Sequence, residues 1–368
     1  MTKKTLYNDE TIFKFIKPND NDKLSEMKGS DLQDLVILLN NYYIQLREQL
    51  DFIPRYDDEI TFGLELEFED ATKEPIKNGL NELFPEEKGK WIYKNDPSLN
   101  DGLEINSPVL RDMPEDWINL NKVCNIVKPW ASIGSRSGGH IHVGAQILGH
   151  YSLGWLNFLK FWSAYENIIY RFTYGDFLTA RSSINEYAKP ISKSLWHDYE
   201  QLSEMQGDLP QIIYKIAEDR YNSVNFRKVN VNYTDMFLNN NTIEFRCPNG
   251  SLDPAIWQNN VNLFVMMLLY CRCLDFDDDI VQKRHRIVSE KYEEVLELYD
   301  EIFLDQALEL CDMLFKNNLD KINFLKQYLK SFEVNKNGMK YEKACELTKE
   351  GIKKVKTKTV FANISFRW

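Results

Sequence analysis

The sequence predicts an α+β fold: a mostly antiparallel sheet backed by helices, with helical additions at both ends. Residues 60–145 carry short alternating apolar stretches separated by turn-forming residues, a pattern typical of strands. Two long runs with helical spacing of apolar residues follow at about 153–177 and 254–274, and further helical text begins near 287. Strands grouped in one region and helices packed around them define the α+β class.

We expect the chain to divide into three parts. Residues 1–58 form a predicted N-terminal helical extension, with Ser30 and Asp31 as the helix cap. The strand and helix patterns that follow define a catalytic domain at 59–275. Residues 276–368 are predicted to be a helical region that ends in a short basic tail, which we interpret as solvated surface.

Composition excludes several classes of protein. Of 368 residues, 43% are hydrophobic and 13% aromatic, so a sizeable core is available. The net charge of -11 disfavours a generic grip on nucleic-acid backbone, which needs surplus Lys and Arg. Six scattered cysteines lack zinc-knuckle spacing and indicate buried thiols in a reducing compartment. No signal peptide or membrane-spanning run is visible, so we expect a cytoplasmic protein without membrane contact.

Four short stretches share one pattern, in which apolar residues alternate with acids, imidazoles or a guanidinium. They are Phe62–Glu69, Leu103–Asn106, His140–Val143 and Ile243–Cys247. Because successive side chains of a strand point to opposite faces, each stretch has one apolar and one reactive face. If the four strands are neighbours, their reactive faces together form a site for divalent metal and phosphate, composed of Glu65, Glu67, Glu104, His140, His142, Glu244 and Arg246.

Each motif alone also fits a simpler explanation. Two carboxylates at Glu65 and Glu67 lie roughly 6.6 Å apart on a strand face, and they repel by about 2.5 kcal/mol at an effective dielectric of 20. In water the same repulsion is well below about 1 kcal/mol, so a solvated acidic face is tolerated, whereas an enclosed face needs a cation. The pair His140 and His142 fits either ligation or hydrogen-bonded core imidazoles. Glu244-x-Arg246 fits either a metal and phosphate pair or a salt bridge.

The combination of motifs favours a particular chemistry. Carboxylate oxygens dominate the predicted ligands, which suits Mg²⁺ or Mn²⁺ better than Zn²⁺. The sequence has no Walker-type phosphate loop, so a nucleotide would be held through metal and Arg. It also has no Gly-x-Ser-x-Gly elbow, which argues against an α/β-hydrolase.

The motifs and their order resemble those of the amidoligase family. The resemblance covers about residues 60–260 and rests on five segments in the same order: Gly63-x-Glu65-x-Glu67, Asp96-Pro97-Ser98-Leu99 with Leu103-Glu104-x-x-Ser107-Pro108, Gly139-His140-x-His142-Val143-Gly144, Tyr221–Asn225, and Thr242–Asp253. That family belongs to the carboxylate–amine ligases with a glutamine synthetase-like fold. Pro97 departs from the glycine that the family usually has after the Asp, and the additional substrate segments of glutamine synthetase are missing.

The resemblance implies a curved sheet whose concave face binds ATP and Mg²⁺ ions, with Mn²⁺ as the alternative. By the same carry-over, the metal ligands would be Glu65, Glu67, Glu104, His140 and Glu244, and the phosphates would contact His142 and Arg246. Arg220 and Asn225 would help to hold the nucleotide, and the substrate would contact Asp96, Ser107 and Asn249. Among these, Glu65, Glu67, Glu244 and Arg246 are the expected catalytic residues.

The expected reaction is ATP-driven amide formation from a small-molecule or peptide carboxylate and an amine, through an acyl phosphate. Glu65 or Glu69 is the candidate for deprotonating the amine. A phosphotransferase or hydrolase on the same fold, and an inactive binding module, are the alternatives.

Overall fold

In the computed structural model, one six-stranded sheet runs through the middle of the described chain. The structure describes residues 16–27, 44–52, 59–86, 89–175, 181–192, 219–230, 240–291 and 303–329, with isolated positions between these ranges. The strand order is β2-β3-β1-β4-β6-β5, and every neighbouring pair is antiparallel. The strands are β1 (Phe62–Phe68), β2 (Ile92–Lys94), β3 (Leu103–Asn106), β4 (Gly139–Gly144), β5 (Val224–Asn225) and β6 (Thr242–Phe245).

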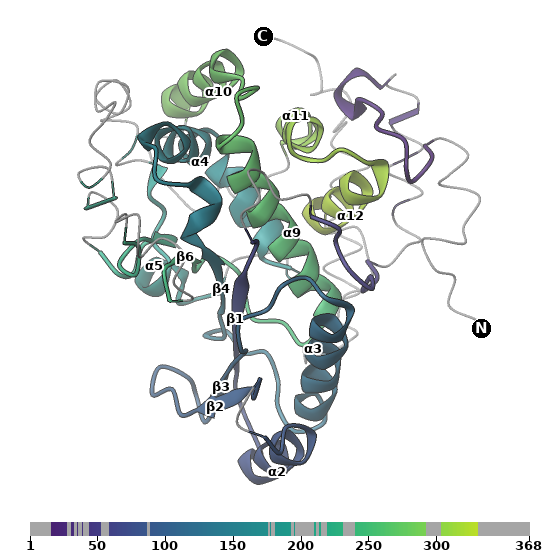
Figure 1. The fold of residues 1–368 in the computed structure, drawn as a ribbon, viewed down its shortest axis with the longest axis vertical. Coiled ribbons are helices and arrows are strands. Elements are labelled where there is room, and N and C mark those ends of the chain that lie inside the picture. Colours follow the sequence, from purple (N-terminus) through teal and green to yellow (C-terminus); the bar gives the residue numbers. More distant parts are fainter. Residues whose placement is uncertain are drawn as a thin grey trace.

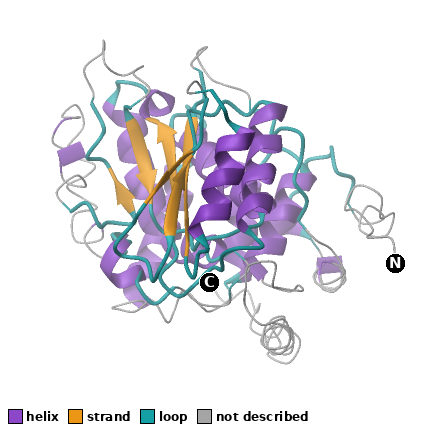
Figure 2. Ribbon diagram, turned by 90° about the horizontal axis from the view of Figure 1, so that it is seen from below, coloured by secondary structure: helices purple, strands orange, loops and turns teal. Residues whose placement is uncertain are grey.

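Helices pack against this sheet and extend beyond it (Figure 1). Figure 2 shows the strands as one layer beside the helices. The helices with described bounds are α2 (Lys73–Leu83), α3 (Pro114–Val127), α4 (Ser152–Thr173), α5 (Ile184–Tyr187), α9 (Pro254–Cys271), α10 (Asp278–Lys291), α11 (Leu304–Leu314) and α12 (Asn318–Leu329), with short 3₁₀ turns at Leu24–Glu26 and Ala145–Leu148. The predicted α+β class is confirmed. No helix among the described residues has the length and apolar character of a membrane span.

The register of β1 explains how the sheet separates its two faces. Glu65 pairs with His140 on β4, and Glu67 pairs with Glu104 on β3. The alternate residues Leu64 and Leu66 are fully buried on the opposite face. Directly paired residues point to the same side of a sheet, so the polar row of β1 continues across its neighbours.

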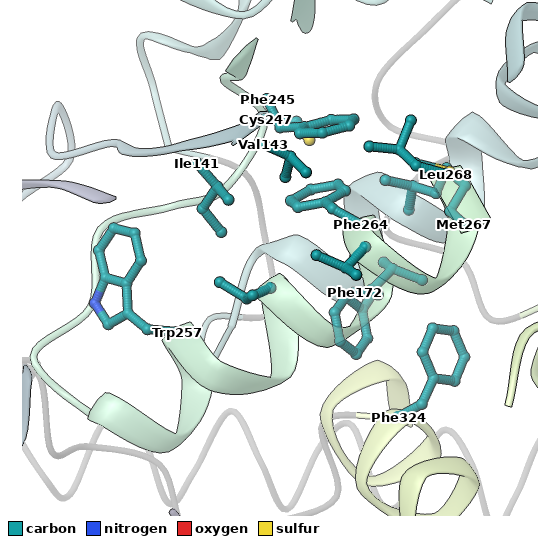
Figure 3. Packing of buried hydrophobic residues seen from close by; sticks show 14 of the residues in the cluster. Ile141, Val143, Phe172, Phe245, Cys247, Trp257, Phe264, Met267, Leu268 and Phe324 are labelled. Atoms are coloured by element: carbon teal, nitrogen blue, oxygen red, sulfur yellow. The ribbon is translucent and has the colours of Figure 1, made fainter. Parts of the chain in front are cut away.

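Helix α9 covers the apolar face of the sheet, with α4 beside it. Phe245 of β6 stacks on Phe264 of α9 at 4.0 Å between ring centroids, and Trp162 of α4 stacks on the same Phe245 at 5.9 Å. Figure 3 shows Ile141 and Val143 of β4 facing the same helix. Burial of large aromatic and aliphatic side chains on one face fixes which face is left for the site.

Two segments that the sequence pattern assigned to strands are helices, so the prediction for 60–145 is wrong there. These are α2 and α3. Helix α3 buries Trp117, Leu120, Val123, Cys124 and Val127, and this spacing is helical. Its start also carries Pro114 at the first helical position, where proline is favoured.

The terminal additions pack on the central part instead of standing apart from it. Helix α12 contacts both α4 and α9, and the turn at Leu24–Glu26 contacts α11. Buried residues from all these segments join one hydrophobic cluster. The boundaries at 58 and 275 remain predictions. Most of the predicted N-terminal helix and the basic tail at 353–358 lie outside the described residues.

Candidate functional site

The structure brings the reactive faces of the four predicted strands together. His142 pairs with Glu244 across β4 and β6, and Asn225 of β5 pairs with the same Glu244. Together with the pairs on β1, these contacts produce one polar surface that runs from β3 to β5. Residues up to 179 positions apart in the chain, Glu65 and Glu244, thus lie in one small region.

A cavity of about 670 Å³ lies over this polar surface. Its volume is in the range of small-molecule sites, which measure roughly 300–1,000 Å³. Its lining is rich in charge and comprises Glu65, Glu67, Asp96, Pro97, Ser98, Glu104, Arg136, His140, Arg181, Ser183, Tyr187, Arg220, Tyr221, Asn225, Arg227, Lys228, Glu244 and Arg246.

Glu65 lies at the centre of the site between two imidazoles. Its Oε2 is 2.8 Å from His140 Nδ1, and its Oε1 is 3.0 Å from His142 Nε2. Burial on its own would raise the pKa of Glu65, but the hydrogen bonds and charges of the two imidazoles outweigh it and hold the pKa well below its ordinary value. Glu65 is therefore a carboxylate that stays ionised.

Glu65, His140 and Glu244 form the first candidate metal group. One ligand atom from each lies within 4.8 Å of the others. Burial and Arg246 would lower the pKa of His140, but Glu67 and Glu65 raise it above its ordinary value. Burial would raise the pKa of Glu244, but His140 and Arg246 lower it. The two carboxylates thus retain negative charge in a nearly buried position, which is the condition under which a cation binds well.

Glu67, Asp96 and Glu104 form the second candidate metal group, also with ligand atoms within 4.8 Å of one another. The N–H of Gly138 donates to Glu67 Oε2 at 2.6 Å and fixes that carboxylate. Burial and the charge of Glu65 raise the pKa of Glu104, and its nearest described cation, Lys94, is 3.8 Å away. Asp96, which the sequence suggested as a substrate contact, therefore lies with two predicted metal ligands.

The donor chemistry of both groups fits Mg²⁺ or Mn²⁺. Five of the six ligating side chains offer carboxylate oxygen and one offers imidazole nitrogen. Hard oxygen donors of this kind suit small divalent cations, and no thiol is among them. The residues present are thus compatible with the metals expected from the sequence.

Arg246 is oriented by contacts on two sides. Its guanidinium donates to Glu244 Oε1, and its Nε donates to the carbonyl of Tyr187 at 2.9 Å. Asn225 Nδ2 donates to the other oxygen of Glu244 at 2.8 Å. Arg246 and Asn225 both line the cavity, as expected of groups that contact a ligand. Arg220 also lines it, on an exposed loop, with its guanidinium 4.5 Å from the Tyr221 ring centroid.

Four sequence-predicted residues do not line the cavity, and each instead supports the residues around it. His142 holds Glu65 and lies 3.3 Å from Thr242 Oγ1. Ser107 Oγ accepts from the N–H of Leu64 at 2.8 Å. Asn249 Oδ1 accepts from the backbone N–H of Arg181 at 3.1 Å. The fourth residue, Glu69, binds backbone N–H groups and is described further below.

The cavity also contains cations that the sequence reading missed. Arg181 is buried, and its guanidinium donates to the carbonyls of Pro248 and Arg246. Burial lowers its pKa, an effect that Glu67 opposes and Arg246 reinforces. Nothing in its local sequence marks it, because its partners are about 65 residues away. Arg227 and Lys228 form a basic turn one residue after the strand at Val224–Asn225, and this turn was a visible signal in the sequence.

An antiparallel sheet that presents two carboxylate-rich candidate metal groups and several cations to one cavity is typical of an enzyme that handles charged substrates. Residues 93–268 match the family model described as "Putative amidoligase enzyme", which confirms the resemblance over that region. The matched region contains Asp96, Glu104, His140, Glu244 and Arg246, and it begins after β1. The family description indicates an enzyme of the ligase class. A search of curated proteins finds no matching relative.

Proposed function

We propose that the protein is an ATP-dependent ligase that joins a carboxylate to an amine through an acyl-phosphate intermediate. The observation that supports the proposal is that the two candidate metal groups and Arg246 all line one cavity. The family match over residues 93–268 supports the ligase class. Small-molecule or peptide substrates fit the size of the cavity.

The charges around the cavity support a polyanionic substrate. Among the described residues, five carboxylates and six Lys or Arg side chains line it, so the formal charge is nearly balanced. Two divalent cations would leave a clear excess of positive charge. A triphosphate together with a substrate carboxylate would neutralise that excess, whereas a neutral substrate would not.

The residues of the chain have distinct parts in the proposed reaction. Divalent cations bound by the two groups would neutralise charge on the phosphates. Arg246, held by Glu244 and Tyr187, presents a guanidinium whose delocalised charge suits a transferring phosphoryl group. The substrate carboxylate attacks the γ-phosphate and ADP leaves. The amine then displaces phosphate from the acyl phosphate, and the departing phosphate takes up the proton that the amine loses.

The contacts of Glu65 and Glu69 bear on which group could act as the base. Glu69 does not line the cavity, and its two oxygens accept from backbone N–H groups. Glu65 lines it, but its strongly lowered pKa makes it a weak base. These contacts argue against both carboxylates suggested by the sequence as the group that takes a proton from the amine.

The experiment measures phosphate release from ATP with Mg²⁺ and a pool of acids and amines, together with mass spectrometry of the pool. A ligase yields a product lighter than its two parts by one water. We expect Glu244→Gln and Arg246→Ala to lower the rate by about 10²–10³-fold, as loss of a charge-stabilising group does. Glu59→Gln and Arg111→Ala are matched controls, since both residues are outside the cavity and pair with each other on the surface.

The outcomes separate the alternatives. A hydrolase would act without ATP, a phosphotransferase would leave a stable phosphorylated product, and a binding module would release no phosphate. Wild-type rates in both site variants would end the proposal.

A further inference from the structure

Glu69 directly follows β1 and lies on the same face as Glu65 and Glu67, but its carboxylate binds backbone N–H groups of two loops. It is buried, with 4% of its surface exposed, and it is outside the cavity lining. Its Oε1 accepts from the N–H of Asn100 at 2.9 Å, and its Oε2 accepts from the N–H of Arg136 at 3.2 Å. One carboxylate therefore ties two separate loops to the end of β1.

Each of these loops serves the second candidate metal group. The loop at 95–102 carries Asp96, which is one of its three ligands. The loop at 134–138 ends at Gly138, whose N–H fixes the carboxylate of Glu67, another ligand. The two loops that donate these hydrogen bonds to Glu69 contain none of Glu65, His140 and Glu244, which form the first group.

The backbone around Glu69 is shaped to admit its side chain. A Cβ on Gly134 would lie 1.6 Å from Glu69 Oε2, so only glycine leaves room for the carboxylate there. The backbone of Glu69 is bonded in both directions to Ser132, with N–O distances of 2.8 and 3.0 Å. The side chain and backbone of Glu69 are therefore both fixed, and the position of the carboxylate determines where the two loops lie.

We propose that Glu69 is a positioning residue for the metal group Glu67–Asp96–Glu104, selective for this group over Glu65–His140–Glu244. The inference rests on the proposed function, because it requires both groups to bind cations. Outer groups that orient ligands typically change metal affinity by about 10–100-fold when they are altered.

The test is a titration of the full chain with Mn²⁺ alone, in which electron paramagnetic resonance reports free Mn²⁺. We expect two ions per wild-type chain. In Glu69→Gln the amide can accept one backbone N–H but opposes the second with its own N–H group. One ion should then bind as in wild type, and the other should bind about 10–100-fold more weakly.

A second variant reaches the same carboxylate without changing its charge. Gly134→Ala should push Glu69 aside and give the same selective loss. Asp112→Asn is the matched control. Asp112 is another buried carboxylate that accepts from a backbone N–H, that of Leu50, and from the indole of Trp117, away from the cavity. The Asp112→Asn variant should bind two Mn²⁺ ions as wild type does.

The possible results lead to different conclusions. Fewer than two ions in wild type would overturn the two-metal site and the proposed function with it. Two ions in wild type with unchanged binding in both Glu69→Gln and Gly134→Ala would overturn the role of Glu69 alone. Equal weakening of both ions would show a general loss of structure and would overturn the selectivity.

Discussion

Three glutamates that look equivalent in the sequence have three different environments. Glu65 is bound by two imidazoles, Glu67 by the N–H of Gly138, and Glu69 by the N–H groups of two loops. Strand alternation places all three on one face. Their roles differ because their partners come from residues 31 to 77 positions away, which no local pattern can indicate.

His285 on α10 allows a prediction of pH dependence at the scale of one residue. Burial, followed by the charge of Arg286, lowers its pKa from 6.5 to about 4. Its Nδ1 lies 3.2 Å from Ser163 Oγ. As pH falls, the unfolded chain binds a proton at this residue near pH 6.5, but the folded chain does not until about pH 4. The contribution of His285 to stability is therefore largest above pH 6.5 and declines toward pH 4.

The measurement compares melting temperatures of wild type and His285→Gln between pH 7.5 and 4.5. Wild type should lose more stability than the variant over this interval. Other titrating groups are common to both proteins, so the difference reports His285. Parallel curves would contradict the lowered pKa.

At the scale of elements, the loop before β3 packs closely against the end of β1. A Cβ on Gly102 would lie 2.2 Å from the carbonyl oxygen of Phe68 and 2.7 Å from Leu99 Cβ. Gly63, in the interior of β1, is different, because its nearest neighbours would be at 3.8 and 3.9 Å. Two glycines near the same strand are therefore expected to respond oppositely to alanine.

Gly102→Ala should destabilise the protein by about 1–3 kcal/mol, since the backbone oxygen of Phe68 cannot yield as a flexible side chain would. Gly63→Ala should be neutral or should stabilise the protein by up to about 1 kcal/mol, because glycine in a strand interior is less stable than alanine. Urea unfolding followed by tryptophan fluorescence gives both values. A Gly102→Ala protein as stable as wild type would disprove the close contact between Gly102 and the carbonyl oxygen of Phe68.

At the scale of the whole molecule, the segment before the sheet is attached to the last described helices. Asn318 at the start of α12 is fully buried. Its Oδ1 accepts from the N–H of Asp22 at 2.9 Å, and its Nδ2 donates to the carbonyl of Lys17 at 2.7 Å. Lys321, 1% exposed, is 2.8 Å from Asp312 and also donates to the carbonyl of Asp22.

Asn318→Ala should lower the free energy of unfolding by about 1–3 kcal/mol for each partner left unsatisfied. Binding of Mn²⁺ should stay as in wild type, since Asn318 is outside the cavity lining. Thermal unfolding measures the loss, and Asn125→Ala on the exposed surface of α3 serves as the control. No loss of stability would show that residues 16–27 are held by other contacts.

The sequence predicted the strands with strong alternation and the two longest helices, since these patterns are local. It also predicted which strand residues share the polar face, because alternation together with antiparallel pairing settles that point. It missed α2 and α3 within a region of mixed signals, and it missed Arg181, whose partners are set by the tertiary fold. His142 was expected to contact phosphate, and Ser107 and Asn249 to contact substrate, whereas the hydrogen bonds of all three are directed at neighbouring protein groups.

The central position of β1 couples correct folding to the integrity of the site. A displacement of this strand by one residue against β3 and β4 would turn Glu65 and Glu67 into the hydrocarbon interior and bring Leu64 and Leu66 out to water. Charged groups without partners are strongly disfavoured there. A misaligned chain would thus be too unstable to persist, so molecules that reach the native state should carry both carboxylates on the correct side.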